Sequence, residues 1–177
     1  MFIVRRQDVK QASKPKGYVR FNVLGEPKGK GRPKFTTRGG YARAITPEQT
    51  VSYENLIMVE YRRQCGTRRF DDNVMIGMRV VAYYGVPKSA SKKKRAAMLD
   101  GEIRPTKKPD NDNIVKVVED ALNDVAYKDD KNIVDCVVQK YYSEQPQIIV
   151  EMWNAEQSKL KISLTRLLTS ILSGAKQ

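Results

Sequence analysis

Hydrophobic and polar residues alternate along several short stretches of the chain, and other stretches repeat apolar residues at helical spacing. Alternation rich in β-branched and aromatic residues is typical of strands, whereas apolar residues three and four positions apart indicate a helix. The patterns predict strands over 18–24, 41–45, 73–86, 133–142 and 147–153, and helices over 46–65, 112–122 and 155–173. The last two strands are expected to form a hairpin around 143–146. This non-alternating order of strands and helices predicts an α+β fold.

Residues at the ends of these elements refine the prediction. Thr46 is expected to cap the first helix with Pro47 at its first position, and Gly66 to end it. The helix over 112–122 has one apolar stripe, formed by Ile114, Val117, Val118, Ala121 and Leu122. Loops are expected over 25–34 and 101–109, a turn at Gly39-Gly40, and a mobile basic stretch over 87–95 that continues as a short helix to Leu99.

We divide the chain into a basic N-terminal arm (1–16), a central domain (17–154) and a C-terminal amphipathic helix (155–177) that packs on the core or extends a dimer interface. The 177 residues contain no run of 18 or more apolar residues, so we expect no membrane partner. Residues 1–16 lack the apolar segment of a signal peptide, so we expect a cytoplasmic location. Cys65 and Cys136 are expected to be small buried hydrophobes. The sequence contains no histidine, which excludes chemistry that depends on a histidine base or ligand.

Charge is distributed unevenly along the chain. The net charge is +13, but residues 101–155 hold 7 basic and 11 acidic residues and carry −4. The basic remainder predicts a polyanionic partner, because lysine and arginine that meet phosphates release condensed counterions. The acidic island would weaken such binding unless its carboxylates hold a cation.

The acidic island contains a pattern suited to a hard cation. Asp110 and Asp112 flank one residue at the predicted helix start, and carboxylates in this arrangement can converge on Mg²⁺. Lys116 shares the helix face of Asp112 and could neutralise charge on a phosphate. Asp129 and Asp130 add two carboxylates beyond the helix. The alternative is structural: Asp110 as an N-cap, Asp112 as a complement to the helix dipole, and Asp129-Asp130 as an ordinary turn.

The loop over 25–34 is the strongest candidate for phosphate binding. Its basic residues alternate with glycine and proline, which suits a close approach to phosphates, although a solvated basic loop is the alternative. The two lysines that precede Pro109 and Asp110 belong to the same group of candidates. The DNA-binding candidates are therefore Lys28, Lys30, Arg32, Lys34, Lys107 and Lys108.

Two separated segments resemble the RusA-type endodeoxyribonucleases, the Holliday junction resolvases common in phages and prophages. The segment KPDNDNIVKVVEDALN, followed by YKDDK, is similar to the family's D-x-D-N-x-x-K-x-x-x-D-A-L helix start and its paired aspartates. The upstream GEPKGKGRPKF resembles the family's G-x-P-x-x-K-x-R-P segment. The resemblance covers about residues 17–154. The Ser/Lys-rich insertion over 89–95 is found in many phage-type members but not in the shortest ones.

The resemblance implies a small mixed sheet flanked by helices and a homodimeric, Mg²⁺-dependent enzyme, with Mn²⁺ as an alternative ion, that nicks four-way junctions symmetrically in a bacterial cytoplasm. The family's catalytic residues fall on Asp110, Asp112, Lys116 and Asp130, with Asp129 beside it. The connector before Asp129 is about one residue shorter than in the best-known member, so either aspartate of the pair could be the ligand. Without histidine, water activated by a metal is the natural nucleophile. The number of metal ions stays open.

Geometry leaves two ways to assemble the site. A helix of about 11 residues is roughly 16 Å long, with Asp112 at its start and Asp130 beyond its end. Either the connector returns along the helix, or a second subunit supplies the missing carboxylate. The alternative function is a non-catalytic protein of the same fold that binds branched DNA.

Overall fold

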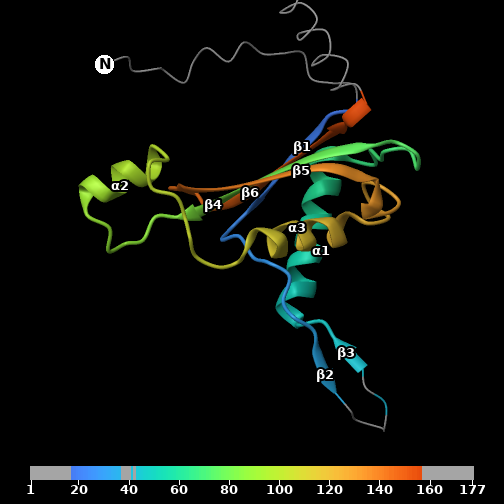
Figure 1. Cartoon of the computed structure of the whole chain (residues 1–177), viewed down its shortest axis with the longest axis horizontal. Helices are drawn as coiled ribbons and strands as arrows, with labels where there is room; N and C mark the ends of the chain where they lie inside the picture. Colours follow the sequence, from blue (N-terminus) through green and yellow to red (C-terminus); the bar gives the residue numbers. More distant parts are fainter. Residues whose placement is uncertain (1–16, 37–40, 42, 157–177) are drawn as a thin grey trace, which may run out of the picture.

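The computed structural model describes residues 17–36, 41 and 43–156. Figure 1 shows one sheet with the longer helices on one side of it, a short helix beyond one end, and a small hairpin that extends away. The main sheet comprises β1 (Val19–Leu24), β4 (Ile76–Gly85), β5 (Ile133–Ser143) and β6 (Gln147–Asn154), and the hairpin comprises β2 (Lys34–Thr36) and β3 (Arg43–Ile45). The helices are α1 (Glu48–Cys65), α2 (Lys92–Leu99) and α3 (Asn111–Leu122), with a 3₁₀ turn η1 (Asp130–Asn132). The fold is α+β with a mixed sheet, as predicted.

The strand order corrects one prediction. The sheet runs β1-β6-β4-β5, with β4 parallel to β5 and antiparallel to β6. The last two strands therefore do not form a hairpin, because β4 lies between them. The link Glu144–Pro146 has to cross two strand spacings, about 10 Å, which three residues can span when extended. β4 is buried over most of its length, so it occupies the interior position that hydrogen bonds to two neighbours.

Alternate residues of the sheet pack against α1 and α3 on a single face. In β1 the buried residues are Val19, Phe21 and Val23, as its alternation predicts. The predicted apolar stripe of α3 is confirmed, since all five of its members are buried. Figure 1 shows α3 lying along the sheet with α1 crossing beneath it. The two helices thus bury one face of the sheet and hold the start of α3 at a fixed position.

The opposite face of the sheet carries polar side chains. Glu151 of β6 pairs with Arg20 of β1 at 3.5 Å and with Arg79 of β4 at 3.3 Å, and Arg79 also donates to Gln139 of β5. Near one end of the sheet the Trp153 ring covers Gly77, so that a Cβ on Gly77 would overlap the indole. Gly77 is therefore required by the ring that lies on it.

The helix ends agree only partly with expectation. Pro47 has an extended ψ of 139° and forms the cap of α1, with its carbonyl accepting from the Thr50 and Val51 amides. The helix thus begins one residue later than predicted, and Thr46 is not its cap. Gly66 ends α1 as predicted, at φ 67°. Positive φ favours glycine there.

The basic stretch before α2 is also corrected. Lys92–Arg95 forms the first turn of α2 rather than a mobile segment. The Ser91 hydroxyl accepts from the Lys94 amide, and Arg95 pairs with Glu144. These two contacts anchor a turn in which a cluster of positive charge opposes the helix dipole.

Several predictions concern single residues or outer segments. Cys65 is buried as expected, but Cys136 is exposed because it lies on the edge strand β5. The N-terminal arm, the Gly39-Gly40 turn and the C-terminal helix beyond Glu156 lie outside the described residues. None of the helices within the described ranges is long and apolar enough to cross a membrane.

The packing of Trp153 on Gly77 can be tested by stability measurements. Gly77→Ala should lower the free energy of unfolding by about 1–3 kcal/mol, because the added methyl displaces the ring. In a Trp153→Ala background the same change should be neutral or stabilising, since glycine weakens a strand interior. Urea denaturation of the four proteins measures both effects, and an equal loss in both backgrounds would contradict this packing.

Candidate active site at the start of helix α3

The first turn of α3 presents two of the predicted carboxylates to solvent. Asp110 occupies the N-cap position with extended backbone, Asp112 lies in the first turn, and both are exposed. The carboxylate of Asp110 makes no capping hydrogen bond. The alternative that this side chain serves as an ordinary N-cap is therefore not supported. Lys116 is exposed one turn after Asp112.

A lysine of β5 holds the loop that leads into these carboxylates. The Lys140 amine donates to the carbonyls of Lys107 at 3.2 Å and Pro109 at 2.5 Å. Arg104 donates from Nε to the Lys140 carbonyl at 2.9 Å, and its guanidinium lies 4.3 Å from the centre of the Tyr141 ring. Sequence reasoning missed both residues, because Lys140 belongs to no recognisable motif. The only available signal was a lysine within the predicted strand over 133–142.

Arg104 and Lys140 form the cationic wall of a small hollow. This hollow of about 420 Å³ is lined by Arg104, Pro105, Asn111, Val138 and Lys140. None of these side chains is acidic. The hollow lies against Asn111, the first residue of α3. An anion could therefore reach that end of the helix through it.

The predicted basic loop packs against the other side of the α3 start. The Lys30 amide donates to the Asn113 carbonyl at 2.8 Å. A Cβ on Gly29 would lie 2.5 Å from Pro109 Cβ, so glycine is required where the loop touches the residue before Asp110. The Gly31 amide donates to the Thr50 hydroxyl at 3.0 Å. The loop is thus fixed to both α1 and α3.

These contacts enclose a second and larger hollow of about 570 Å³. Its charged lining comprises Lys28, Lys30, Arg32, Lys108 and Asp110. Lys28, Arg32 and Lys108 are exposed. The structure therefore brings predicted DNA-binding residues and a predicted metal ligand to one hollow, as phosphate binding beside a cation requires.

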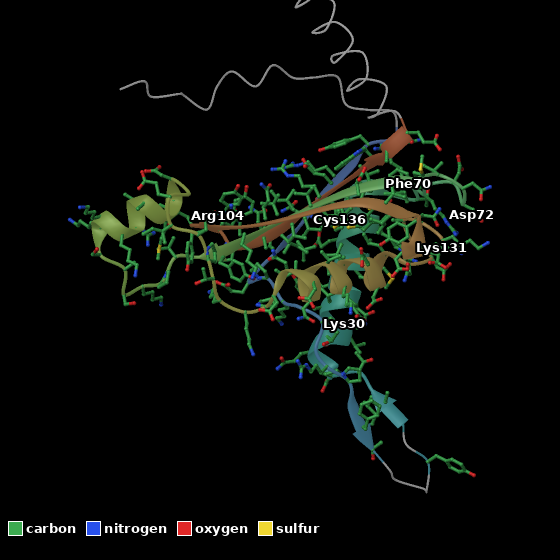
Figure 2. The ribbon with its side chains drawn as sticks, in the orientation of Figure 1. Lys30, Phe70, Asp72, Arg104, Lys131 and Cys136 are labelled. Carbon is green, nitrogen blue, oxygen red and sulfur yellow. The ribbon has the colours of Figure 1, made fainter. Side chains whose placement is uncertain are left out.

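Lys30 itself is engaged elsewhere. Its amine contacts the carboxylates of Glu54, at 2.7 Å, and Asp120. Burial opposes the charge of Lys30, but the two carboxylates outweigh it and raise the pKa of the amine. Figure 2 shows Lys30 beside α1, just below α3. Its surroundings favour a role in fixing the loop over the predicted phosphate contact.

The remaining DNA-binding candidates differ in their surroundings. The Lys107 amine lies 4.9 Å from the centre of the Tyr84 ring and 3.8 Å from Glu26. Lys34 begins β2, and its side chain lies outside the described part of the structure. Lys107 therefore stands next to the loop that carries Asp110, although it does not line the larger hollow.

The paired aspartates lie at the opposite end of α3. Asp129 caps η1 and accepts from the Lys131 amide at 3.0 Å, which lowers the pKa of its carboxyl. Asp130 is exposed beside the last turns of α3. Burial of Glu119 in this region, together with the negative charges of Asp130 and Asp120, raises the pKa of the Glu119 carboxyl. Figure 2 shows Lys131, next to Asp130, far from Arg104.

The connector does not return along the helix. The Tyr127 hydroxyl donates to the Glu119 carbonyl at 3.0 Å, so the Tyr127 side chain lies against the last turn of α3 rather than near its start. A helix of 12 residues is about 18 Å long. Among the described residues no three acidic or cysteine side chains form a group that could hold a metal ion. One chain thus offers Asp110 and Asp112, whose hard oxygens fit Mg²⁺, and keeps Asp130 at a distance.

Comparison with known proteins identifies the family to which this chain belongs. Residues 25–153 match the family described as Endodeoxyribonuclease RusA. YqaN of Bacillus subtilis (strain 168), described as an uncharacterized protein, is 38% identical over 137 residues that cover 75% of this chain and 93% of that protein. The chain belongs to the RusA family of endodeoxyribonucleases. The resemblance inferred from the two sequence segments is confirmed.

The distinct role of Lys30 predicts two separable effects. Lys30→Met should lower the free energy of unfolding by about 1–3 kcal/mol, because Glu54 and Asp120 lose their partner. It should leave the salt dependence of DNA binding unchanged. Lys28→Ala should instead reduce the slope of log K against log salt by about 1, as expected for a lost phosphate contact.

These effects are measured by urea denaturation and by fluorescence anisotropy over a salt series. A cycle with Asp120→Asn should show coupling above about 0.5 kcal/mol in stability. An equal change of slope for both lysine variants would contradict the assignment.

Proposed function

We propose that this protein is a Mg²⁺-dependent Holliday junction resolvase that makes paired nicks in four-way DNA junctions. The observation that supports the proposal is the pair Asp110 and Asp112 at the start of α3, beside a hollow lined with lysine and arginine. Mg²⁺ commonly takes one or two carboxylates and completes its shell with water and substrate phosphate oxygens. We further propose that the protein acts in the cytoplasm of a bacterial host and is encoded by a phage or prophage.

Each group in the site has a distinct task in phosphodiester hydrolysis. Asp110 and Asp112 would hold Mg²⁺, or Mn²⁺ in its place, and the bound ion supplies an activated water and relief of phosphate charge. Lys28, Arg32 and Lys108 bind the phosphates that flank the cleaved bond. Lys116 neutralises charge that develops on the phosphate oxygens. Lys140 orients Asp110 by holding the carbonyls of the preceding loop.

We propose that two copies of the chain complete the site. β5 is an edge strand of the sheet, and Val134 and Val137 on it are 48% and 49% exposed. An unpaired strand edge is a template for pairing with another chain. Pairing about a twofold axis relates the same surface on both subunits. The edge of β5 is the surface that such a dimer would use.

The direction of β5 suggests what the partner contributes. β5 runs against α3, because its start follows Asp130 while Lys140 reaches the loop before Asp110. A full-length antiparallel pair of β5 strands would bring the start of one beside the end of the other, where Lys140 holds the loop before Asp110. Val138 and Asn111 line the same cationic hollow. Asp130 of the partner subunit would thereby approach the α3 start that Asp130 of the same chain does not reach.

Cleavage of a synthetic four-way junction tests the activity. With Mg²⁺ the wild type should release paired nicked products, and EDTA or Asp112→Asn should abolish cleavage while binding persists. Lys116→Met should slow cleavage by about 10²–10³-fold. Asp124→Asn is a matched control, because it removes one carboxylate from the far end of α3 at a positive φ that asparagine tolerates.

A wild type that binds junctions without nicking them in Mg²⁺ or Mn²⁺ would instead favour a non-catalytic binding protein of the same fold. Equal loss of activity in Asp124→Asn and Asp112→Asn would argue against a local site at the α3 start.

Mixed dimers test whether the site is shared. In a dimer of one Asp110→Asn and one Asp130→Asn subunit, a shared arrangement leaves one site with both native aspartates. The mixture should therefore regain nicking, confined to one strand of each junction. A mixture of Asp110→Asn and Asp112→Asn is the control, since both of its sites stay defective. Absence of cleavage in the first mixture would count against sharing.

A further inference from the structure

We infer that the β2–β3 hairpin is a contact for unpaired bases at the branch point, with Phe35 as the stacking residue. The inference rests on the proposed function and extends it to how a branch is distinguished from continuous duplex. Figure 1 shows the hairpin extending from the body of the protein, away from the sheet. It is joined to the body only through the basic loop on one side and the start of α1 on the other.

Packing among the described residues does not explain the position of Phe35. Its side chain is 76% exposed, although it lies in a strand. Phe35 pairs with Ala44 across the hairpin, so the side chain opposite the Phe35 ring is only a methyl group. Ile45, which pairs with Lys34 on the opposite face, is 52% exposed. A phenylalanine that contributes nothing to the core is free to meet a partner.

The charge around Phe35 indicates the chemistry of that partner. Residues 32–43 contain Arg32, Lys34, Arg38 and Arg43 and no acidic residue. Basic residues close in sequence to an exposed aromatic ring supply the positive charge and the stacking surface that bind single-stranded nucleic acid, in which every base offers a face for stacking.

The hairpin is continuous with the candidate active site. Arg32 and Pro47 both line the larger hollow, together with Asp110. Each lies two residues from a hairpin strand, which is about 7 Å of extended chain. Bases within a duplex are stacked and paired, whereas bases at a branch can be unstacked. A ring inserted among them would bring a phosphate close to the branch point to Asp110.

The test uses the full chain with one fluorescent reporter. Phe35→Trp is made in a Trp153→Phe background, so that the introduced indole is the single tryptophan of the protein. Its emission should be quenched by single-stranded DNA and by a four-way junction, and much less by a duplex. Phe35→Ala should weaken junction binding by about 5- to 150-fold and duplex binding little. Ile45→Ala is the matched control on the opposite face and should bind as the wild type does.

The outcomes separate this inference from the proposed function. Loss of junction preference in Phe35→Ala, with nuclease activity of the wild type intact, supports the stacking role. Equal junction affinity of Phe35→Ala and wild type, or an indole that single-stranded DNA does not quench, overturns it whether or not the protein cleaves. Conversion of a dimer to a monomer by Phe35→Ala, measured by light scattering, would show a contact between subunits and would also overturn it. Failure of the wild type to cleave any junction, with quenching preserved, would reject the nuclease and retain the base contact.

Discussion

The position of the α3 start depends on hydrogen bonds from two lysines to backbone carbonyls. The Lys140 amine holds the carbonyls of Lys107 and Pro109, while the Lys30 amide holds that of Asn113. These bonds approach from opposite sides, from a sheet strand and from the basic loop. Because carbonyls on both sides of Asp110 in the chain are held, the backbone of Asp110 has little freedom to move, although its side chain is exposed. Such support is what a site needs when its ligands must hold a cation in one geometry.

The same contacts explain how basic and acidic segments coexist. The Lys30 amine pairs with Glu54 and Asp120, so it is not available as one of the predicted DNA-binding cations. The pair of Lys30 with Asp120 joins the two segments that carry the family resemblance. In the proposed function, the cations that remain exposed around Asp110 would offset the repulsion between its carboxylate and a DNA phosphate. The positive charge of the chain is therefore divided between a structural part and a part available to a ligand.

Sequence reasoning found the elements and the residues but not all of their neighbours. The stripe of α3 and the cap at Gly66 follow from local periodicity and backbone preference, so they were predictable. The place of β4 between β5 and β6 depends on which strand buries most surface. The short link Glu144–Pro146 instead favoured a hairpin of β5 and β6, which is why the prediction was wrong. Lys140 and Arg104 act through contacts between distant segments, which single-sequence patterns do not contain. The separation of Asp130 from Asp110 likewise depends on where the chain turns after Tyr127.

The opposite placement of the aspartates along α3 has a consequence for the conditions under which the protein acts. In the proposed shared site, one chain alone does not bring Asp130 to Asp110 and Asp112, so a lone chain would be a poor nuclease. Activity would then rise with the square of the protein concentration when the subunits are dilute. Two cuts would become available together once the subunits associate. In the proposed arrangement, the length of one helix would in this way make cleavage depend on the association of two subunits.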